Sequence, residues 1–191
     1  ISNCANAELC LDPFHIVRWA TQALDVVRRH TWNLLRQLGV PGQAKQLKNC
    51  RYALWKNPED LTDRQQIKLA WIARHNQRLY RAYLLKEQLR LVFAHRGDAA
   101  IAMLDAWLSW ARRSQISAFV ELYHRIKKHR QGIIAAVTHG LSNGLTESVN
   151  TKLRLLTRIA YGFKSTDNLI ALCYLDRGGY CPDLPARTKA A

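Results

Sequence analysis

The chain has 191 residues, of which 48% are hydrophobic, enough to bury the core of one domain and too many for extensive disorder. Its 29 basic and 14 acidic side chains leave a formal net charge of +15, so the simplest partner is a polyanion, first nucleic acid and then an anionic membrane surface. A basic domain whose charge only maintains solubility is the alternative. The most apolar stretch, residues 99–111, contains Asp105 and is far shorter than the roughly 20 residues of a membrane-spanning helix, so no helix is expected to span a membrane. Of the two polyanions, we expect nucleic acid and no membrane as the partner.

The start of the sequence has neither an initiator methionine nor a secretory signal pattern, and we expect the chain to be a piece of a longer protein. The five cysteines are odd in number and include no Cys-x-x-Cys pair. This pattern predicts reduced thiols and favours neither a disulfide framework nor a zinc site.

The first third of the chain begins with a short apolar stretch, residues 7–11, which predicts the end of a buried strand. Asp12 and Pro13 follow as a helix start, because an aspartate caps a first turn and proline suits the first helical position. Apolar residues at helical spacing predict a helix over residues 13–38. A Gly-Val-Pro-Gly run ends that helix, and a basic connector is expected over residues 43–57.

The remainder of the chain reads as a series of helices. Thr62 and Gln65 predict a capping box at the start of a helical region that runs to about residue 95, with a break near residues 75–76. Gly132 is expected to interrupt a later helix. Further helices are predicted over residues 98–113, 117–128, 145–160 and 166–177, followed by a tail at 178–191. The predicted fold class is therefore mainly α, with little strand.

The helix predicted over residues 145–160 is amphipathic. Apolar side chains fall within about 80° of one another around the helix axis at about 100° per residue; they are Leu145, Val149, Leu153, Leu156 and Ala160. The opposite face carries one carboxylate, Glu147, together with Asn150, Thr151, Arg154 and Arg158. One carboxylate surrounded by basic side chains is the pattern expected of a metal ligand that lies next to the phosphate backbone of a bound nucleic acid. The alternative is a solvated face with an attraction between Glu147 and Arg154.

Asp12 is the second candidate for chemistry. A carboxylate at the end of a strand is held rigidly enough to bind a metal ion, whereas a purely structural aspartate here would only cap the following helix. His15 follows one turn later and is either a packed or capping histidine or a neighbour of the metal site. The basic run at residues 127–130 is either a solvated surface or a set of phosphate contacts.

Three parts of the sequence resemble one known family, the DDE transposases of bacterial insertion sequences. The first part resembles the C-terminal motif of that family. It is Asn143-Gly-Leu-Thr-Glu147-Ser-Val-Asn150 and continues through Lys152, Arg154 and Arg158 to Ala160-Tyr161-Gly162-Phe163. The second part, Asn6-Ala7 with Asp12-Pro13-Phe14-His15, resembles the motif around the family's second catalytic aspartate. The third part, residues 79–93 with Tyr83, Lys86 and Glu87, resembles the family's helical insertion.

The resemblance implies an RNase H-like α/β core of which this chain holds the helical C-terminal part. Residues 1–38 would then be the end of a core strand and its following helix, and residues 39–140 the helical insertion. Residues 141–177 would be the core helices that carry the glutamate, followed by the tail at 178–191.

The same resemblance implies Mg²⁺-dependent DNA cleavage and strand transfer. Asp12 and Glu147 would be catalytic metal ligands, with His15 beside them, while Asn150, Lys152, Arg154, Arg158 and Lys164 would contact DNA. The implied partners are transposon-end and target DNA in a bacterial cytoplasm, with a second copy of the chain as a further candidate.

The chain departs from the family pattern at the first catalytic aspartate. Only eleven residues precede Asp12, and Glu8 is the single acid among them, at a position that does not match the motif. We therefore expect no catalysis by this chain alone. The alternative function is a non-catalytic helical DNA-binding or regulatory protein derived from a transposase; a helical protein-interaction module fits the high positive charge less well.

Overall fold

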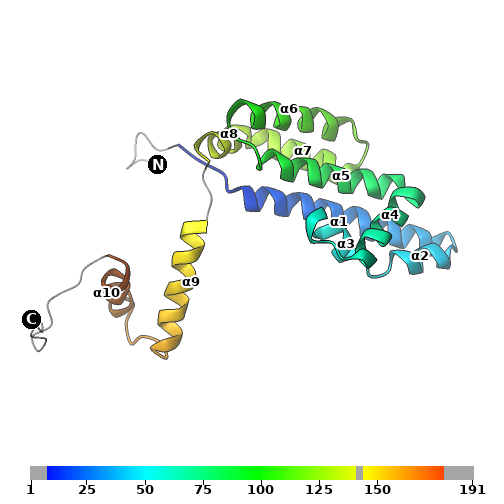
Figure 1. The fold of residues 1–191 in the computed structure, drawn as a ribbon. Coiled ribbons are helices and arrows are strands. Elements are labelled where there is room, and N and C mark those ends of the chain that lie inside the picture. The colour runs from blue at the N-terminus through cyan, green and yellow to red at the C-terminus, as the bar shows by residue number, and fades with distance from the viewer. Residues whose placement is uncertain (1–7, 141–143, 179–191) are drawn as a thin grey trace, which may run out of the picture. The chain divides into compact units, whose positions relative to one another are not determined.

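The computed structural model describes residues 8–140 and 144–178 and divides into two compact units, Ile1–Leu141 and Ser142–Ala191. These described residues form ten α-helices and one short 3-10 helix, and they contain no strand (Figure 1). The predicted mainly α fold is confirmed. The predicted tail and Asn143 of the glutamate motif lie outside the described residues.

The first unit holds most of the helices. They are α1 (Pro13–Gln37), α2 (Pro41–Leu47), α3 (Arg51–Trp55), η1 (Pro58–Asp60), α4 (Asp63–His75), α5 (Gln77–Val92), α6 (Gly97–Arg113), α7 (Ser117–Lys128) and α8 (Arg130–His139). The second unit holds α9 (Gly144–Ile159) and α10 (Thr166–Arg177). No helix within the described ranges is long and apolar enough to cross a membrane.

Local side-chain hydrogen bonds explain several helix boundaries that the sequence predicts. Gln65 Oε1 accepts a hydrogen bond from the Thr62 backbone N–H at 3.1 Å, as the capping box requires. Asn76 separates α4 from α5, and its side chain caps α5 by accepting from the Leu79 N–H at 2.9 Å. Gly39 follows α1 with φ +67°, a left-handed conformation that glycine adopts without steric cost.

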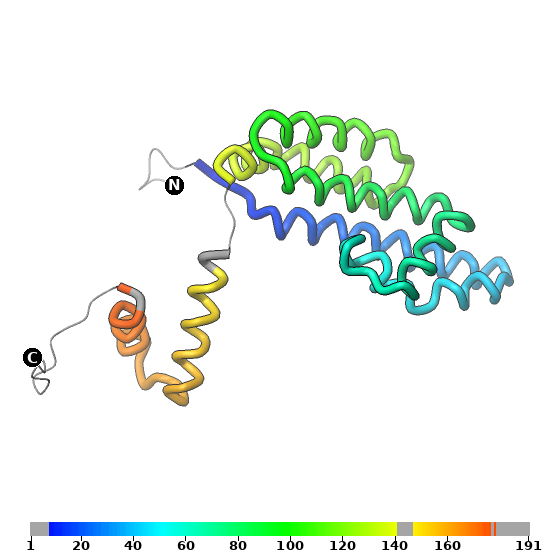
Figure 2. The backbone as a smooth tube through the Cα atoms, in the orientation of Figure 1, coloured from blue at the N-terminus to red at the C-terminus, as the bar shows by residue number. Residues whose placement is uncertain are grey.

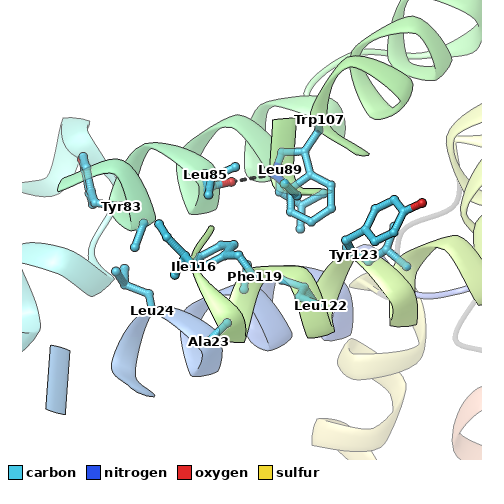
Figure 3. Close-up of a cluster of buried hydrophobic side chains, with 14 of the residues drawn as sticks. Ala23, Leu24, Tyr83, Leu85, Leu89, Trp107, Ile116, Phe119, Leu122 and Tyr123 are labelled. Carbon is cyan, nitrogen blue, oxygen red and sulfur yellow. Dashed lines mark hydrogen bonds between the residues drawn. The ribbon is translucent and has the colours of Figure 1, made fainter. Parts of the chain in front are cut away.

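The core of the first unit lies where α1 packs against α5 and α7, with α6 beside α5, α7 and α8 (Figure 2). Leu24, Leu85, Leu89 and Phe119 are fully buried there (Figure 3). Trp107 is also fully buried, and its Nε1–H donates to the Leu85 carbonyl at 2.8 Å. Burial of this apolar surface stabilises the bundle, since each large side chain contributes about 1.5–3 kcal/mol.

A charged cluster lies beside this apolar core, on the segment that resembles the helical insertion. Lys86 is fully buried, contacts the Glu87 carboxylate, and donates to the carbonyls of Trp55 and Lys56 at 3.4 Å, so it ties the end of α3 to α5. Burial lowers the pKa of Lys86, and the ion pair with Glu87 opposes that shift. Burial, together with the charge of Glu87, raises the pKa of Tyr83 to about 12.

Three local predictions are wrong. Residues 8–12 form no strand; the Leu11 N–H instead donates to the Gly132 carbonyl of α8 at 2.9 Å. Gly132 does not interrupt a helix, because α7 ends before His129 and Gly132 lies inside α8. The region predicted as a basic connector, residues 43–57, is largely helical instead: it contains most of α2 and all of α3, which pack on α1. Its buried side chains are Ala44, Leu47, Ala53 and Leu54.

Candidate active site

Asp12 lies at the N-terminus of α1 and performs the structural role that the sequence offers as an alternative. Its Oδ1 accepts a hydrogen bond from the Phe14 N–H at 3.0 Å, which caps the first turn. Its side chain is only 13% exposed. Oδ2 accepts no hydrogen bond from the described residues, so one carboxylate oxygen remains available to a cation while the other fixes the side chain.

His15 lies close to this oxygen, as its position one turn after Asp12 predicts. Its Nε2 is 3.7 Å from Asp12 Oδ2, and its side chain is 57% exposed. The contact is an ion pair only when the imidazole is protonated. His15 is therefore placed beside the carboxylate, and its role toward a metal ion stays a prediction.

Residues 8–11, here called the strap, directly precede Asp12 and lie against α8. A Cβ atom on Gly132 would lie 2.8 Å from Leu11 Cδ1 and 3.0 Å from the Leu9 carbonyl oxygen, so any side chain at this position would crowd the strap. At its start, Glu8 Oε2 lies 2.7 Å from His139 Nε2. The acid that precedes Asp12 is thus occupied by a contact to α8.

Glu147 lies in the first turn of α9, in the second unit, and is exposed. A carboxylate here interacts favourably with the helix dipole. Asn150, Arg154 and Arg158 are also exposed on this helix, in agreement with the polar face that the sequence predicts. No ion pair joins Glu147 to Arg154 in the described part of the chain, so the carboxylate oxygens remain available to other cations.

The cations around Glu147 have no acidic partner among the residues that the structure describes. Lys152 and Lys164 are exposed, like Arg154 and Arg158, and none of these four forms an ion pair there. Arg28 and Arg29 of the first unit differ in this respect, because both contact the Asp25 carboxylate, at 2.8 and 3.2 Å. Unpaired guanidinium and ammonium groups are suited to phosphate oxygens.

The predicted apolar face of α9 is only partly buried. Val149, Leu153 and Leu156 are half-buried, while Ala160 is exposed. Two further apolar side chains of α9, Leu155 and Ile159, are 55% and 66% exposed.

The two candidate carboxylates lie in different units, Asp12 in the first and Glu147 in the second. Their approach to within roughly 8 Å, as a shared two-metal site requires, therefore stays a prediction. Within residues 8–140 and 144–178, no group of three or more His, Cys, Asp or Glu side chains is placed to hold a metal ion. The donor chemistry of the two carboxylates nevertheless suits Mg²⁺, which is commonly bound by one or two carboxylates together with water and phosphate oxygens.

Sequence reasoning missed Gly132, which the helix pattern presents as a break. Its role becomes visible only when the strap before Asp12 is placed against α8. The glycine within an otherwise apolar helical segment is the one local sign, because it costs a helix about 1 kcal/mol relative to alanine and a packing role would explain its presence.

Comparison with known proteins gives a family match over residues 2–173, to a family model of ISL3-type DDE proteins that is described as a transposase. The transposase of insertion sequence element IS1557 from Mycobacterium tuberculosis, in two strains, is 55% identical over 203 residues, which cover 96% of this chain and 46% of the relative. The transposase of IS1001 from Bordetella parapertussis is 31% identical over 163 residues, which cover 84% of the chain and 40% of the relative. The chain thus spans less than half the length of these relatives. No solved structure gives a significant match.

Proposed function

The chain belongs to the ISL3 family of DDE transposases, and from this premise we propose that it supplies two of the catalytic carboxylates, Asp12 and Glu147, for phosphodiester cleavage and strand transfer at insertion-sequence ends. The observation that carries the proposal is the family match over residues 2–173, which includes both carboxylates and the motif around Glu147. The DNA substrate would place this reaction in the cytoplasm of a bacterium.

Asp12 suits this role because its two oxygens have separate tasks. Oδ1 caps α1, and this hydrogen bond restrains the side chain, so Oδ2 would lose little conformational freedom on binding a metal ion. When bound, Mg²⁺ would supply electrostatic stabilisation of the attacking and leaving oxygens of the phosphoryl group. Asp12 and Glu147 are the residues of this chain that would hold it, and His15 would adjust the charge beside Oδ2.

The exposed polar side chains of α9 and the residues after it suit contact with the DNA backbone next to Glu147. We assign this role to Asn150, Lys152, Arg154, Arg158 and Lys164. One guanidinium group can donate hydrogen bonds to two phosphate oxygens at once, and the amide of Asn150 can donate to a phosphate or to a base edge. These contacts would position DNA independently of Mg²⁺, since they require no metal.

The 191-residue chain is expected to bind DNA without cleaving it. Glu8 is the sole acid before Asp12, and it is directed to His139 at 2.7 Å. We therefore expect the third carboxylate to come from outside these residues. Two carboxylates alone would bind Mg²⁺ weakly, because the ion requires near-octahedral oxygen coordination.

The test is cleavage of a labelled transposon end by a longer polypeptide that includes the segment preceding these residues. Asp12→Asn and Glu147→Gln should each abolish Mg²⁺-dependent cleavage while DNA binding is retained. Asparagine caps a helix as well as aspartate does, so Asp12→Asn separates loss of the charge from loss of the helix cap. Glu121→Gln, an exposed acid on α7, is the matched control and should cleave normally.

A non-catalytic DNA-binding or regulatory protein is the second candidate function, favoured by the net charge of +15 and by the incomplete set of acids. DNA binding that depends on salt but is indifferent to Mg²⁺, with no cleavage by the longer polypeptide, would support this function. Cleavage by the 191-residue chain itself, lost on Glu147→Gln, would show that the third acid lies within these residues.

A further inference from the structure

A cationic hollow lies on the first unit, whereas the glutamate motif belongs to the second unit. The hollow is formed by α6, α7 and the start of α8, three helices that pack together (Figure 1). We propose that this hollow, which we call the α6–α7 groove, is a second binding site for the phosphate backbone of duplex DNA. Its charged lining residues are Arg112, Arg113, Lys127, Arg130 and Asp105.

The charges of the groove are unevenly paired. Arg130 forms two hydrogen bonds with the Asp105 carboxylate, at 3.0 and 2.8 Å, so these two charges largely neutralise each other. Arg112, Arg113 and Lys127 are exposed, and no carboxylate of the described residues pairs with any of them. The groove therefore presents three uncompensated positive charges within one hollow.

One of the three cations, Arg113, is partly held in place before any ligand binds. Arg113 donates from Nε to the Ser109 carbonyl at 3.2 Å and from Nη2 to the Ser109 hydroxyl at 3.0 Å, so its guanidinium is oriented while Nη1 remains available. The Lys127 ammonium lies 6.0 Å from the centre of the Tyr123 ring. Pre-oriented donors lose less side-chain entropy on binding, which favours a recognition site over a freely solvated surface.

The floor of the groove is apolar, and this decides which kind of anion fits. Leu108 and the ring of Tyr123 line it, and both side chains are buried; Figure 3 shows Tyr123 within the core cluster. Polar donors thus lie at the rim rather than around a closed cavity. A rim of cations over an apolar floor suits a polyanion that passes across the surface, with phosphates at the rim, better than a small anion that must be fully surrounded.

The choice of duplex DNA rests on the proposed function, whereas the anion site rests on the charges of the groove. The groove and the α9 cations lie in separate units, so substitutions in one set leave the side chains of the other set in place. A transposase part with two such surfaces would hold DNA at the insertion as well as beside the catalytic glutamate.

The experiment compares two triple variants of the 191-residue chain that remove the same charge. The groove triple removes the three unpaired cations of the groove and consists of Arg112→Gln, Arg113→Gln and Lys127→Gln. The control triple removes one lysine and two arginines that are exposed outside the groove, and consists of Lys45→Gln, Arg64→Gln and Arg78→Gln. Binding to a labelled DNA duplex is measured by fluorescence anisotropy across a salt series. The groove triple should raise Kd at least about tenfold at about 100 mM salt and reduce the slope of log Kd against log salt by about 2–3, while the control changes the slope by less than about 1.

A single substitution should change the affinity for DNA in the opposite direction. Asp105→Asn removes the groove's carboxylate and releases Arg130, so it should tighten DNA binding and increase the salt slope by about 1. Glu121→Gln removes an acid outside the groove and should leave the slope unchanged.

Several results would contradict the proposal that the α6–α7 groove binds duplex DNA. These are equal losses in both triples, no tightening by Asp105→Asn, or a groove triple that loses binding to phosphatidylserine vesicles but not to DNA. In each of these cases DNA binding by the α9 cations, and with it the proposed function, would stand. A wild-type chain that binds no DNA at all would contradict both.

Discussion

Replacement of Gly132 by alanine tests how the strap positions Asp12. The added Cβ would meet Leu11 Cδ1 at 2.8 Å and the Leu9 carbonyl oxygen at 3.0 Å. The leucine side chain can turn aside, but the carbonyl oxygen belongs to the backbone, so the strap itself must move. Overpacking of this kind costs about 1–3 kcal/mol.

The same substitution also favours the helix, and the two effects oppose each other. Alanine inside a helix is more stable than glycine by about 1 kcal/mol. We therefore expect Gly132→Ala to lower the free energy of unfolding by about 1 kcal/mol, the clash exceeding the gain in propensity. Gly42→Ala is the matched control: Gly42 lies in α2, and a Cβ there would meet nothing within 4 Å. The control should be neutral or stabilising by up to about 1 kcal/mol.

Urea denaturation followed by tryptophan fluorescence measures this difference in the first unit alone. All six tryptophans lie before residue 141, so changes in the second unit do not enter the signal. Amide exchange of Leu11, whose N–H donates to the Gly132 carbonyl, should become faster in Gly132→Ala. A Gly132→Ala protein as stable as Gly42→Ala, with unchanged exchange at Leu11, would refute a rigid strap.

Three further predictions concern the core of the first unit. Lys86→Met should destabilise it by about 1–3 kcal/mol in urea denaturation, because Glu87 loses a buried partner and two carbonyls lose a donor; wild-type stability would contradict this. Because the pKa of Tyr83 is raised from 10.0 to about 12, the folded state keeps a proton that the unfolded state loses, so stability should fall as pH rises through this range, by up to about 2–3 kcal/mol. Tyr83→Phe should remove that alkaline loss, and an unchanged pH profile would exclude this group as its source. Trp107→Phe should cost about 2 kcal/mol by thermal or urea unfolding, since the Leu85 carbonyl loses its indole donor and the core loses volume; a cost below about 0.5 kcal/mol would mean that neighbouring side chains refill the space.

The sequence predicts the helices best where a boundary depends on adjacent side chains. The Thr62 and Gln65 capping box, the Asn76 break and the Asp12 cap are all local interactions, and all are confirmed. The prediction of a connector over residues 43–57 is wrong, and the cause is again local. Pro41 is interpreted there as part of a helix stop, whereas proline also suits the first position of a helix, and α2 begins at this residue.

The remaining errors arise from contacts between distant parts of the chain. An apolar stretch before Asp12 is compatible with a strand, but its partner in the structure is α8, more than a hundred residues later. Gly132 looks like a helix break until the strap lies against it. The cationic groove likewise combines the basic run at residues 127–130 with Arg112 and Arg113 of α6, a grouping that no local pattern predicts.

Iron-directed cleavage of the protein backbone tests most directly whether Asp12 and Glu147 share one metal site. In the longer polypeptide bound to transposon-end DNA, Fe²⁺ replaces Mg²⁺, and ascorbate with hydrogen peroxide generates radicals that cut the chain beside the bound iron. We predict cuts next to both residue 12 and residue 147, and the loss of both cuts in Glu147→Gln as well as in Asp12→Asn. Cutting beside one residue only, or cuts that persist after the other carboxylate is removed, would contradict a shared catalytic site.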